Sequence, residues 1–529
     1  MDVTANIAII GGGISGLSLA YTLSNADNFK GHITVFERSA TLGGNADTAR
    51  VHLGYDHQNG IEFTRLADLG VNDINLGSYP KTRAAMQDIG YLPSDGTLGD
   101  PSDDATFLCP LEDTVCFFTP DSEEIWTKDS FLMDTSVEDR AAVVDMRFSL
   151  DHPDHKILKE AEASFMKTAA MDYADENAGA EYWDFTTAEY VAYYAQRHVV
   201  PPEILEKVTR LFLLPRISAM YFADEVNGAA QMPFRGVMSY YRLQEGFGTD
   251  LDADRRYFKY GSQHWINFLA KHLESEHDVK IVRNFDARIV GDGKDGVLVY
   301  SFFDGQPSQS APLPFDKVVM AAHADHQVDS FMPSDDPLLD DEMAQKMRSI
   351  RYSASLSVAH TYAGLLPANV DSWRTYNVMI RDPDDTALPH PYQMTYVQNR
   401  HRNDRLDKAF NTYGLPTYFV SLNPQEKIPA KYILDVTEED RARRIAERPG
   451  YSTTLSADYD RADKAIAYFR HTVITKNLLD IQKELPAYQG MAGGRVYFVG
   501  CWTLGAGLHE ECFKQAGLVA EDILSPQPT

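Results

Sequence analysis

The chain has 529 residues, of which 44% are hydrophobic and 24% are charged, and its formal net charge is −28. This length favours several domains over a single core, and the composition is that of an ordinary globular protein. The acidic balance argues against nucleic acid or anionic membrane surfaces as main partners, and no apolar run is long enough to span a membrane. Because the first strand begins almost at once, we expect no signal peptide and a cytoplasmic protein.

The first predicted strand leads into a glycine-rich loop of the dinucleotide-binding type. The apolar run 7–10 is typical of a buried strand, and the glycines that follow have the GxGxxG spacing before an apolar helix at 17–23. Gly11 allows a tight turn, Gly13 allows the backbone to approach a pyrophosphate, and Gly16 allows the helix to pack on the strand. The helix N-terminus then offers its N–H groups and its dipole to the phosphates.

The second predicted strand completes this pattern. It covers 33–36 and ends in Glu37, 26 residues after Gly11, where an acid can bond a ribose hydroxyl. A glycine-rich turn in another kind of sheet would leave this acid and its spacing unexplained. We therefore expect a dinucleotide site that includes Ile14 and Ser15 of the loop together with Glu37.

A second glycine pair favours a flavin over a nicotinamide cofactor. Arg38 can reach a phosphate with its fork of donors, and Gly43 and Gly44 suit a loop that runs close beneath a bound dinucleotide. With these motifs the chain resembles the flavin amine oxidase and phytoene desaturase superfamily, whose signature is GxGxxG, a terminal acid and then Arg-x4-Gly-Gly. The resemblance implies FAD as the cofactor, with Asn45, where a His is expected, among the residues that bind it.

The resemblance covers most of the chain, and it is strongest to predicted NAD/FAD-binding proteins of bacteria and fungi, often labelled flavin-containing amine oxidoreductases. Matching blocks include 73–80 and 318–325. The resemblance implies that Leu76 and Gly77 contact the cofactor and that the backbone around Ala287 lies against the adenine. FAD-dependent fatty-acid double-bond isomerases are neighbouring families.

The predicted fold class is α/β, with a discontinuous Rossmann-type FAD-binding domain of the amine oxidase kind and an interleaved α+β substrate domain. The FAD-binding domain is expected to comprise 1–80, 255–330 and 485–529, and the substrate domain 81–254 and 331–484. Further helices are predicted at 156–173, 187–197, 201–214, 265–273 and 461–484, and further strands at 279–282, 288–290, 297–303, 317–320, 356–362, 393–398 and 417–422.

The C-terminal segment is expected to return to the first domain. A strand at 495–500 ends in Gly500, a loop from Cys501 to Gly507 follows, and a helix runs from Leu508 to residue 524. In the resembled flavoproteins the N-terminus of this helix faces the isoalloxazine ring, where it stabilises negative charge on the reduced ring. These four residues are therefore expected to bind the cofactor.

Three residues near the expected ring position are candidates for catalysis. Trp502 could wall one face of the ring or be a core tryptophan. His509, kept neutral by the helix dipole and burial, could donate to the flavin or position substrate, or it could have a capping role. Glu510 could act in catalysis or simply favour the helix dipole.

Neither a metal site nor covalent attachment of the flavin is expected. His323 and His326 lie close in sequence, but no third ligand cluster accompanies them. Cys109 and Cys116 could pair, although buried free thiols are favoured. The Ser-Gly-Gly-Cys pattern of covalent monoamine oxidases is absent, so the FAD is expected to bind non-covalently.

Three functions stay open. The first is an oxidoreductase or redox-neutral isomerase that moves hydride between flavin N5 and a carbon of a hydrophobic, lipid-like substrate (a polyene or fatty acid), giving desaturation or double-bond isomerisation. It rests on the resemblance and on aromatic-rich substrate segments. The alternative is a flavin amine oxidase acting on a C–N bond, which needs an aromatic pair flanking the ring and a Lys near N5. The third is a flavin-binding scaffold without activity. The sequence determines neither the substrate nor the electron acceptor nor the oligomeric state.

Overall fold

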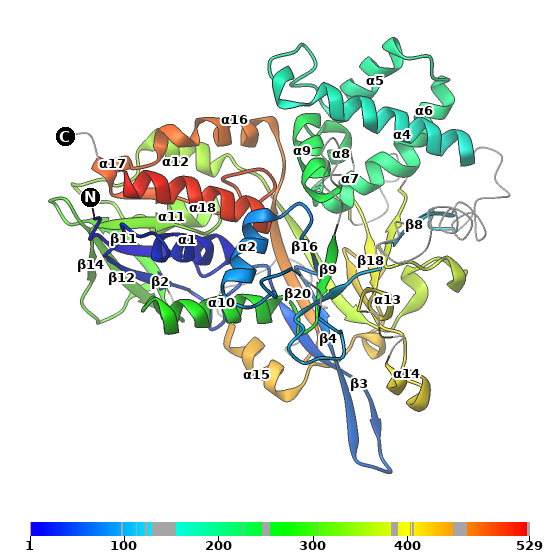
Figure 1. Ribbon diagram of the computed structural model, residues 1–529, viewed down its shortest axis with the longest axis horizontal. Helices are drawn as coiled ribbons and strands as arrows, with labels where there is room; N and C mark the ends of the chain where they lie inside the picture. Colours follow the sequence, from blue (N-terminus) through cyan, green and yellow to red (C-terminus); the bar gives the residue numbers. More distant parts are fainter. Residues whose placement is uncertain are drawn as a thin grey trace.

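Two β-sheets, one in each half of the molecule, organise the structure (Figure 1). The computed structural model describes residues 2–96, 99–112, 114–121, 125–129, 155–225, 227–245, 254–303, 305–381, 390–402, 404, 407–447 and 463–525. None of the helices within these ranges combines the length and the apolar composition that crossing a membrane requires.

The sheet of the first half is five-stranded, parallel and assembled from widely separated parts of the chain. Its order is β10 (Lys280–Val282), β2 (His32–Phe36), β1 (Asn6–Ile10), β15 (Lys317–Met320) and β21 (Val496–Phe498). Alternate side chains of a strand point to opposite faces, so Ile7 and Ile9 pack in one hydrophobic cluster and Ala8 and Ile10 in another. Both faces of this sheet are therefore buried, as a parallel sheet requires.

A different set of structural elements covers each face of the parallel sheet. The cluster around Ile7 and Ile9 contains apolar residues of α1 (Ile14–Ser24), α10 (Ser262–Glu276) and α18 (His509–Leu524). The opposite cluster is built with an antiparallel layer and further helices, namely β11 (Asp286–Gly291), β12 (Val297–Phe303), β13 (Gln306–Pro307), β14 (Leu313–Phe315), α11 (Ala324–Ser330), α12 (Asp341–Arg348), α16 (Lys476–Glu484), η8 (Leu485–Tyr488) and α17 (Met491–Gly494). The amphipathic helices thus bury the apolar faces of β1 and β15 from both sides.

The sheet of the second half is seven-stranded and mixed. Its order is β20 (Ile466–Thr472), β16 (Tyr352–His360), β19 (Phe419–Leu422), β18 (Met394–Val397), β17 (Tyr376–Met379), β7 (Thr114–Phe118) and β8 (Ile125–Asp129), and only the β17–β7 pair is parallel. Short helices border this sheet: η3 (Ala363–Leu365), η4 (Val370–Ser372), α13 (Gln398–His401), α14 (Lys408–Tyr413), η6 (Ala430–Tyr432) and α15 (Glu438–Glu447).

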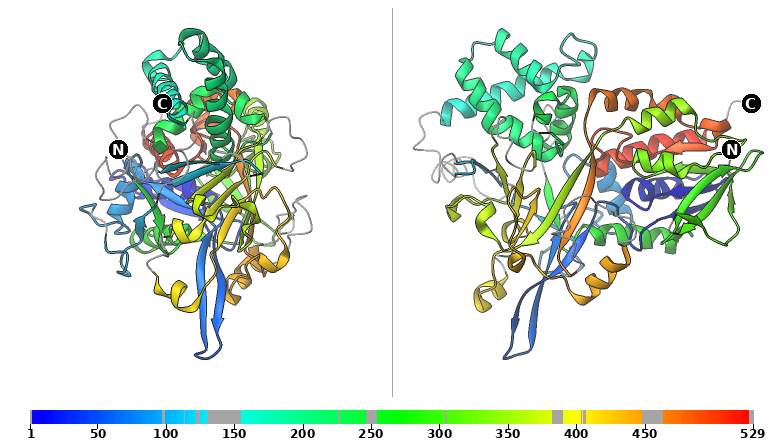
Figure 2. Two further views of the ribbon diagram at one scale, coloured as in Figure 1. Left: turned by 90° about the vertical axis from the view of Figure 1, so that its right-hand side faces the viewer. Right: turned by 180° about the vertical axis from the view of Figure 1, so that it is seen from behind.

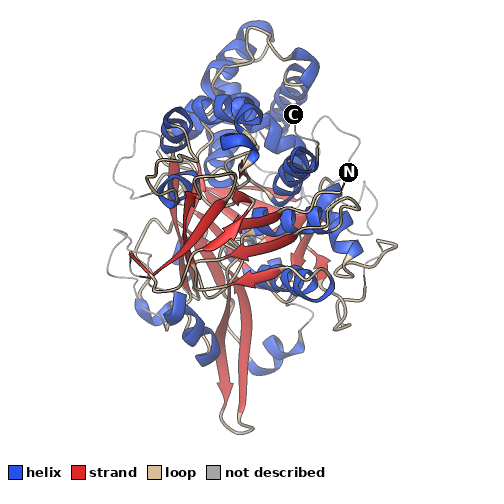
Figure 3. Ribbon diagram, turned by 90° about the vertical axis from the view of Figure 1, so that its left-hand side faces the viewer, coloured by secondary structure: helices blue, strands red, loops and turns tan. Residues whose placement is uncertain are grey.

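A helical layer covers one end of this second sheet (Figure 3). It comprises α4 (His155–Asp172), η1 (Asp175–Asn177), α5 (Thr187–Arg197), α6 (Pro202–Val208), the π-helical turn η2 (Thr209–Leu213), α7 (Leu214–Met220), α8 (Gly228–Gln231) and α9 (Phe234–Glu245). Thr186 caps α5 in a reciprocal arrangement with Glu189. Aromatic rings dominate the core of this layer, where Tyr190 and Phe234 stack with centroids 4.7 Å apart.

Smaller elements join the halves. The strands β5 (Asp73–Asn75), β9 (Arg255–Phe258) and β6 (Leu108–Pro110) form a three-stranded sheet, and α2 (Pro80–Asp88) follows β5. The hairpin β3 (Thr48–Asp56) and β4 (Ile61–Asp68) extends from the body as a long arm in every view (Figures 1 and 2). All four cysteines are free and those at 109 and 116 are buried, as expected.

The predicted fold class is confirmed, and most predicted elements occur within a few residues of their expected bounds. The helix predicted at 461–484 is wrong. Within it, residues 461 and 462 lie outside the described residues, Ile466–Thr472 is a strand paired antiparallel with β16, and only Lys476–Glu484 is helical, beginning after the N-cap Thr475. The helix predicted at 201–214 is α6 continued through η2 into α7, which ends at Met220. The division into five domain segments stays a prediction.

Candidate active site

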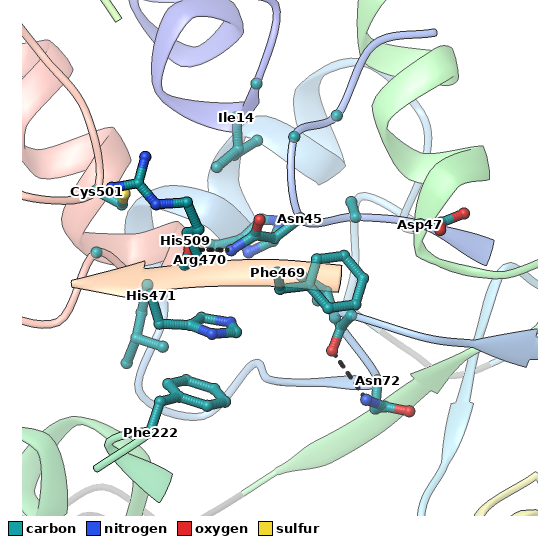
Figure 4. Close-up of a pocket in the computed structure, with 18 of the residues that line it drawn as sticks. Ile14, Asn45, Asp47, Asn72, Phe222, Phe469, Arg470, His471, Cys501 and His509 are labelled. Atoms are coloured by element: carbon teal, nitrogen blue, oxygen red, sulfur yellow. Dashed lines mark hydrogen bonds between the residues drawn. The ribbon is translucent and has the colours of Figure 1, made fainter. Parts of the chain in front are cut away.

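A cavity of ≈ 850 Å³ is lined by both halves of the molecule. On the side of the parallel sheet, its wall is formed by the two glycine loops and the start of α18. On the other side it is formed by β20, the end of α7 and strands of the mixed sheet (Figure 4). The volume is within the range of sites for cofactors and small molecules.

The first glycine loop leaves an open cradle at the carboxyl end of β1. Gly11 has φ +124°, and a Cβ placed on it would lie 2.5 Å from the carbonyl oxygen of Ala321, so only glycine fits there. A Cβ on Gly13 would meet no protein atom within 4 Å. Gly13 is also the N-cap of α1, whose first turn has no capping side chain and no acidic residue. The free N–H groups and positive dipole end of α1 therefore face open space, the arrangement that binds phosphate.

The second glycine loop is held against the first. Gly43 donates its N–H to the carbonyl of Gly12 (3.0 Å), and Gln263 of α10 donates to the carbonyl of Leu42 (2.7 Å). Gly44 has φ +60°, and a Cβ placed on it would have the Cα of Gly13 as its nearest neighbour, at 4.0 Å. Both loops thus present bare backbone to the cavity, where a side chain would occupy the space of a ligand.

Glu37 organises this cradle. Its carboxylate accepts hydrogen bonds from the N–H groups of Gly12 (2.8 Å) and Ser39 (2.8 Å), and Glu37 and Arg38 both line the cavity. The acid therefore fixes the first glycine loop relative to the end of β2. Its contact with a ribose hydroxyl stays a prediction.

The loop after the glycine pair is anchored by charged residues that the sequence analysis did not identify. Asp47 forms ion pairs with Arg443 (3.1 Å) and Arg444 (2.9 Å) of α15, and Asn45 donates to the carbonyl of Arg470 in β20 (3.3 Å). Burial alone would raise the pKa of Asp47, but the two guanidinium groups lower it below its usual range. The loop at 43–47 is consequently fixed to elements of the second half.

The start of α18 closes the cradle on the other side. Glu511 accepts hydrogen bonds from the N–H groups of Ala506 (3.0 Å) and Leu508 (2.9 Å), and burial raises its pKa to about 7. His509 lines the cavity, its Nε2 is buried and has no hydrogen-bond partner in the described part of the chain, and burial lowers its pKa to about 4. A neutral imidazole with an unsatisfied nitrogen thus lies in the wall of the cradle, where a bound group would satisfy it.

Two of the three expected catalytic residues occupy structural positions. Trp502 is fully buried in the core beside Phe498, and it is not among the described residues that line the cavity. Glu510 is also fully buried, and its carboxylate accepts from Thr82 N–H (3.0 Å), Thr82 Oγ1 (3.1 Å) and Lys81 N–H (3.1 Å) at the start of α2. The burial of Trp502 agrees with a core tryptophan, and a catalytic role for either residue stays a prediction. Of the three, only His509 is among the described residues that line the cavity.

Some of the residues expected to bind the cofactor line the cavity, and others do not. Those that line the cavity are Gly11, Gly13, Ile14, Ser15, Glu37, Arg38, Gly43, Gly44, Asn45, Cys501, Gly507 and Leu508. Gly16, Leu76, Gly77, Ala287 and Gly500 are not among the described lining residues. A Cβ on Gly16 would lie 2.1 Å from the carbonyl oxygen of Gly11, which agrees with its expected role in helix packing. Cofactor contact by these five residues stays a prediction.

An acidic residue, Asp325, lies close to the two histidines after β15, and the sequence analysis overlooked it. Ligand atoms of His323, Asp325 and His326 lie within 4.8 Å of one another. Arg470 reaches into this cluster, with its Nη2 2.6 Å from Asp325 Oδ2 and its Nη1 3.2 Å from His326 Nε2. The guanidinium supplies the positive charge that the cluster would otherwise draw from a cation. Burial, with His326 and Arg470 nearby, lowers the pKa of His323 to about 3.

Several cavity residues come from segments that the mistaken helix prediction obscured. β20 contributes Phe469, Arg470 and His471, and the turn after α7 contributes Phe222. The run Ile466–Thr472 is rich in β-branched and aromatic residues, a composition that favours a strand over a helix. That composition was the available signal, whereas nothing local in the sequence places Phe222 next to β20.

Comparisons with known proteins agree with this architecture. The family model described as an NAD(P)-binding Rossmann-like domain matches residues 9–88. A comparison with curated proteins gives no match. Among solved structures, a CLA-producing fatty acid isomerase from P. acnes is similar with a TM-score of 0.55 at 14% identity, over 98% of both chains. Putrescine oxidase bound to putrescine is similar with a TM-score of 0.54 at 13% identity, over 99% of this chain and 100% of that one. Cyclohexylamine oxidase from Brevibacterium oxydans gives 0.54 at 14% identity, over 99% of both chains.

The chain has the flavin amine oxidase-like fold. The resemblance inferred from the glycine motifs is thereby confirmed at the level of the fold. The Rossmann-like match covers the end of β1, α1, β2 and the two glycine loops, which form the backbone side of the cradle. A flavin or nucleotide cofactor fits that cradle, because bare glycine backbone, an uncapped helix N-terminus and an unsatisfied histidine nitrogen all face it.

Proposed function

We propose that the protein is an FAD-dependent oxidoreductase or isomerase that acts on carbon–carbon bonds of a hydrophobic, lipid-like substrate. The observation that carries this proposal is the continuity of the cavity, which joins the glycine cradle to a chamber with many apolar and aromatic side chains among a few polar ones, such as Arg216 and Gln244. FAD held in the cradle without a covalent bond would supply a centre that takes hydride from a substrate carbon and, in an isomerase, returns it to another carbon.

The chain's own residues hold and orient the cofactor in this proposal. The N-terminus of α1, with Gly13, and the guanidinium of Arg38 would bind the phosphates, and Glu37 would bind the ribose. The first turn of α18 would direct its N–H groups and His509 to the flavin ring. Because burial lowers the pKa of His509 to about 4, this histidine stays neutral and serves as a hydrogen-bond partner rather than a charge.

The chamber beyond the cradle supports a hydrophobic substrate. Its wall includes Phe117, Met394, Val378 and Ile474, together with the rings of tyrosines that approach from the mixed sheet and the helical layer. A chamber of this composition excludes water from the reacting carbon and binds an apolar chain by burying its surface. Aromatic rings at its edge leave room for a polar group at one end of the substrate.

The test is a turnover screen with the purified protein. The protein should be yellow, and acid precipitation should release FAD. Anaerobic mixing with polyunsaturated fatty acids or polyenes should either bleach the flavin or generate the ultraviolet absorbance of a conjugated diene. A colourless protein with no released FAD would overturn the cofactor assignment. Bleaching by amines alone would overturn the substrate class.

A flavin amine oxidase acting on a C–N bond is the second candidate. The rings of Tyr221 and Tyr240 both line the cavity with centroids 4.6 Å apart, a pairing that suits an ammonium group. It ranks second because no lysine is among the described lining residues, and because Asp73, a carboxylate in the cavity wall, is already paired with Arg255 at 3.2 Å. The amine arm of the same screen decides between the two.

A further inference from the structure

Strand β20 separates two different environments at the centre of the cavity. Arg470 points towards the cluster of Asp325 and His326, while the next residue, His471, points to the other side of the strand (Figure 4). Alternation along a strand requires this division. His471 therefore belongs to the chamber, on the same side as Phe469, whose ring lies 6.2 Å from the imidazole.

The imidazole of His471 is clamped by Phe222. The two rings stack with their centroids 3.5 Å apart and their planes within 8°. The two residues come from different elements, one from β20 and the other from the turn after α7. A flat stack of this kind fixes the plane of the imidazole in the wall of the chamber.

The backbone of Phe222 is held in an uncommon conformation to make this stack. Its φ is +53°, in the left-handed region that bulky residues rarely adopt. The turn is closed by a hydrogen bond from the N–H of Ala223 to the carbonyl of Ser218 (3.0 Å), and the preceding Tyr221 donates its hydroxyl to the carbonyl of Val237. Unfavourable conformations of this kind persist where the surrounding structure enforces them, and they gather at functional sites.

One nitrogen of the imidazole is also left without a hydrogen bond by the described residues. Nδ1 of His471 is buried and has no hydrogen-bond partner among the described residues, although the side chain lines the cavity. Burial, together with the nearby His323, lowers the pKa of His471 to about 3, so the ring is neutral at physiological pH. A neutral imidazole pairs with an uncharged oxygen without bringing a net charge into the chamber.

We propose that His471, clamped by Phe222, positions the substrate by hydrogen-bonding an uncharged oxygen, a hydroxyl or a carbonyl, that lies on the hydrophobic chain near the reacting carbon. This inference rests on the proposed function and adds to its substrate class an uncharged oxygen on the hydrophobic chain, as in a hydroxylated or keto lipid. His471 acts as a positioning residue for the reaction, and no covalent or redox step is assigned to it.

Calorimetric titration of the purified protein with three ten-carbon probes tests the proposal: 1-decanol, 2-decanone and 1-decene. The wild type should bind the alcohol and the ketone about fivefold more tightly than the alkene, the usual gain from one neutral hydrogen bond. His471→Phe keeps a ring to stack on Phe222 but removes both nitrogens. It should bind the alkene as the wild type does and lose the preference for the oxygenated probes.

His264→Phe is the matched control. His264 is a partly buried histidine that packs among aromatic rings outside the described cavity lining, and burial lowers its pKa as well. Its replacement should leave the preference unchanged. Phe222→Ala keeps the nitrogens of His471 but releases the clamp, and it should weaken the preference to about twofold.

Two results would overturn the inference: no preference in the wild type, or an undiminished preference in His471→Phe. Calorimetry reports binding without turnover, so these results do not depend on catalysis. Acid-released flavin, measured on the same samples, reports separately on the proposed function.

Discussion

One side of the cavity consists mainly of backbone, and the other consists mainly of side chains. On the side of the parallel sheet the ligand would meet mostly backbone, at Gly11, Gly13, Gly43 and Gly44. On the side of β20 and the mixed sheet it would meet large side chains, with Phe222 and His471 stacked at the centre. The shape of the first side depends on the absence of side chains at the glycines. The shape of the second side depends on the large side chains that are present.

This difference separates cofactor from substrate specificity. A cradle of backbone N–H groups and a helix dipole recognises a phosphate wherever it occurs, so it identifies a class of cofactor. A chamber of side chains can be altered one residue at a time without disturbing the sheet, so it determines which substrate is accepted. Substitutions on the first side should therefore affect folding or FAD retention, and substitutions on the second side should affect the choice of ligand.

Gly11→Ala should give the largest effect on the backbone side. The new Cβ would lie 2.5 Å from the carbonyl oxygen of Ala321, at a residue whose φ is +124°. Backbone strain and overpacking together should lower the free energy of unfolding by about 3 kcal/mol or more. Urea denaturation followed by circular dichroism measures this loss, and an unchanged midpoint would show that the loop tolerates a side chain.

Gly13→Val should separate FAD binding from folding. Gly13 has φ −78°, which any residue adopts, and a Cβ there meets no protein atom within 4 Å, so stability should not change. The side chain would instead fill the space for the pyrophosphate and weaken FAD binding by roughly 100-fold or more, the loss of about two charge-assisted hydrogen bonds.

FAD retained after gel filtration provides the measurement for Gly13→Val. Gly517→Val in α18 is the matched control, because a Cβ there has only Lys81 Nζ nearby, at 3.8 Å. Full flavin content in Gly13→Val would place the cofactor elsewhere.

Glu511→Gln should change the pH dependence of stability. Burial raises the pKa of Glu511 to about 7 from an ordinary value of 4.5, so the folded state binds the proton more tightly than the unfolded state. The resulting stabilisation is fully present below pH 4.5 and is lost as pH rises through 7, a change of about 3 kcal/mol at most.

The variant mimics the protonated acid, so this pH-dependent loss should disappear. The two proteins should have similar stabilities at pH 4.5, and the variant should be the more stable one at pH 8. Chemical denaturation across this range measures the difference. Parallel curves for the two proteins would show that Glu511 does not titrate in this window.

Glu510→Gln should give the smallest effect, confined to stability. The carboxylate accepts from backbone and side-chain donors at the start of α2, and an amide replaces one accepting oxygen with a donor. The unfolding free energy should fall by about 2 kcal/mol, the contribution of a hydrogen bond to a charged group. Thermal melting shows the loss. A variant with native stability but impaired turnover would support a catalytic role for Glu510.

The backbone side of the cavity could be predicted from sequence because its determinants are local. Gly11, Gly13, Gly16 and Glu37 lie within one strand–loop–helix–strand unit, and their spacing follows from that geometry alone. Such a pattern can be recognised in a sequence without knowledge of distant contacts. The remaining strands of the five-stranded sheet and its closing helix could be inferred from the segments 255–330 and 485–529 because of the family resemblance.

The side-chain wall of the cavity could not be predicted in this way. Phe222 and His471 meet only because α7 and β20 are packed together by the fold, and neither residue lies in a recognisable motif. Trp502 and Glu510 lie close in sequence to the cradle, yet one packs into the core and the other binds the start of α2. Proximity along the chain does not show which way a side chain points.

The use of distant segments in one sheet has a consequence for biosynthesis. β1, α1 and the first glycine loop leave the ribosome before β21 and α18, which pair with β15 and pack on α1. The cradle gains Cys501, Gly507, Leu508 and His509 only when that later segment arrives. In the nascent chain the parallel sheet therefore stays open on one edge until β21 has been synthesised. Completion of the cradle is then a late step of folding.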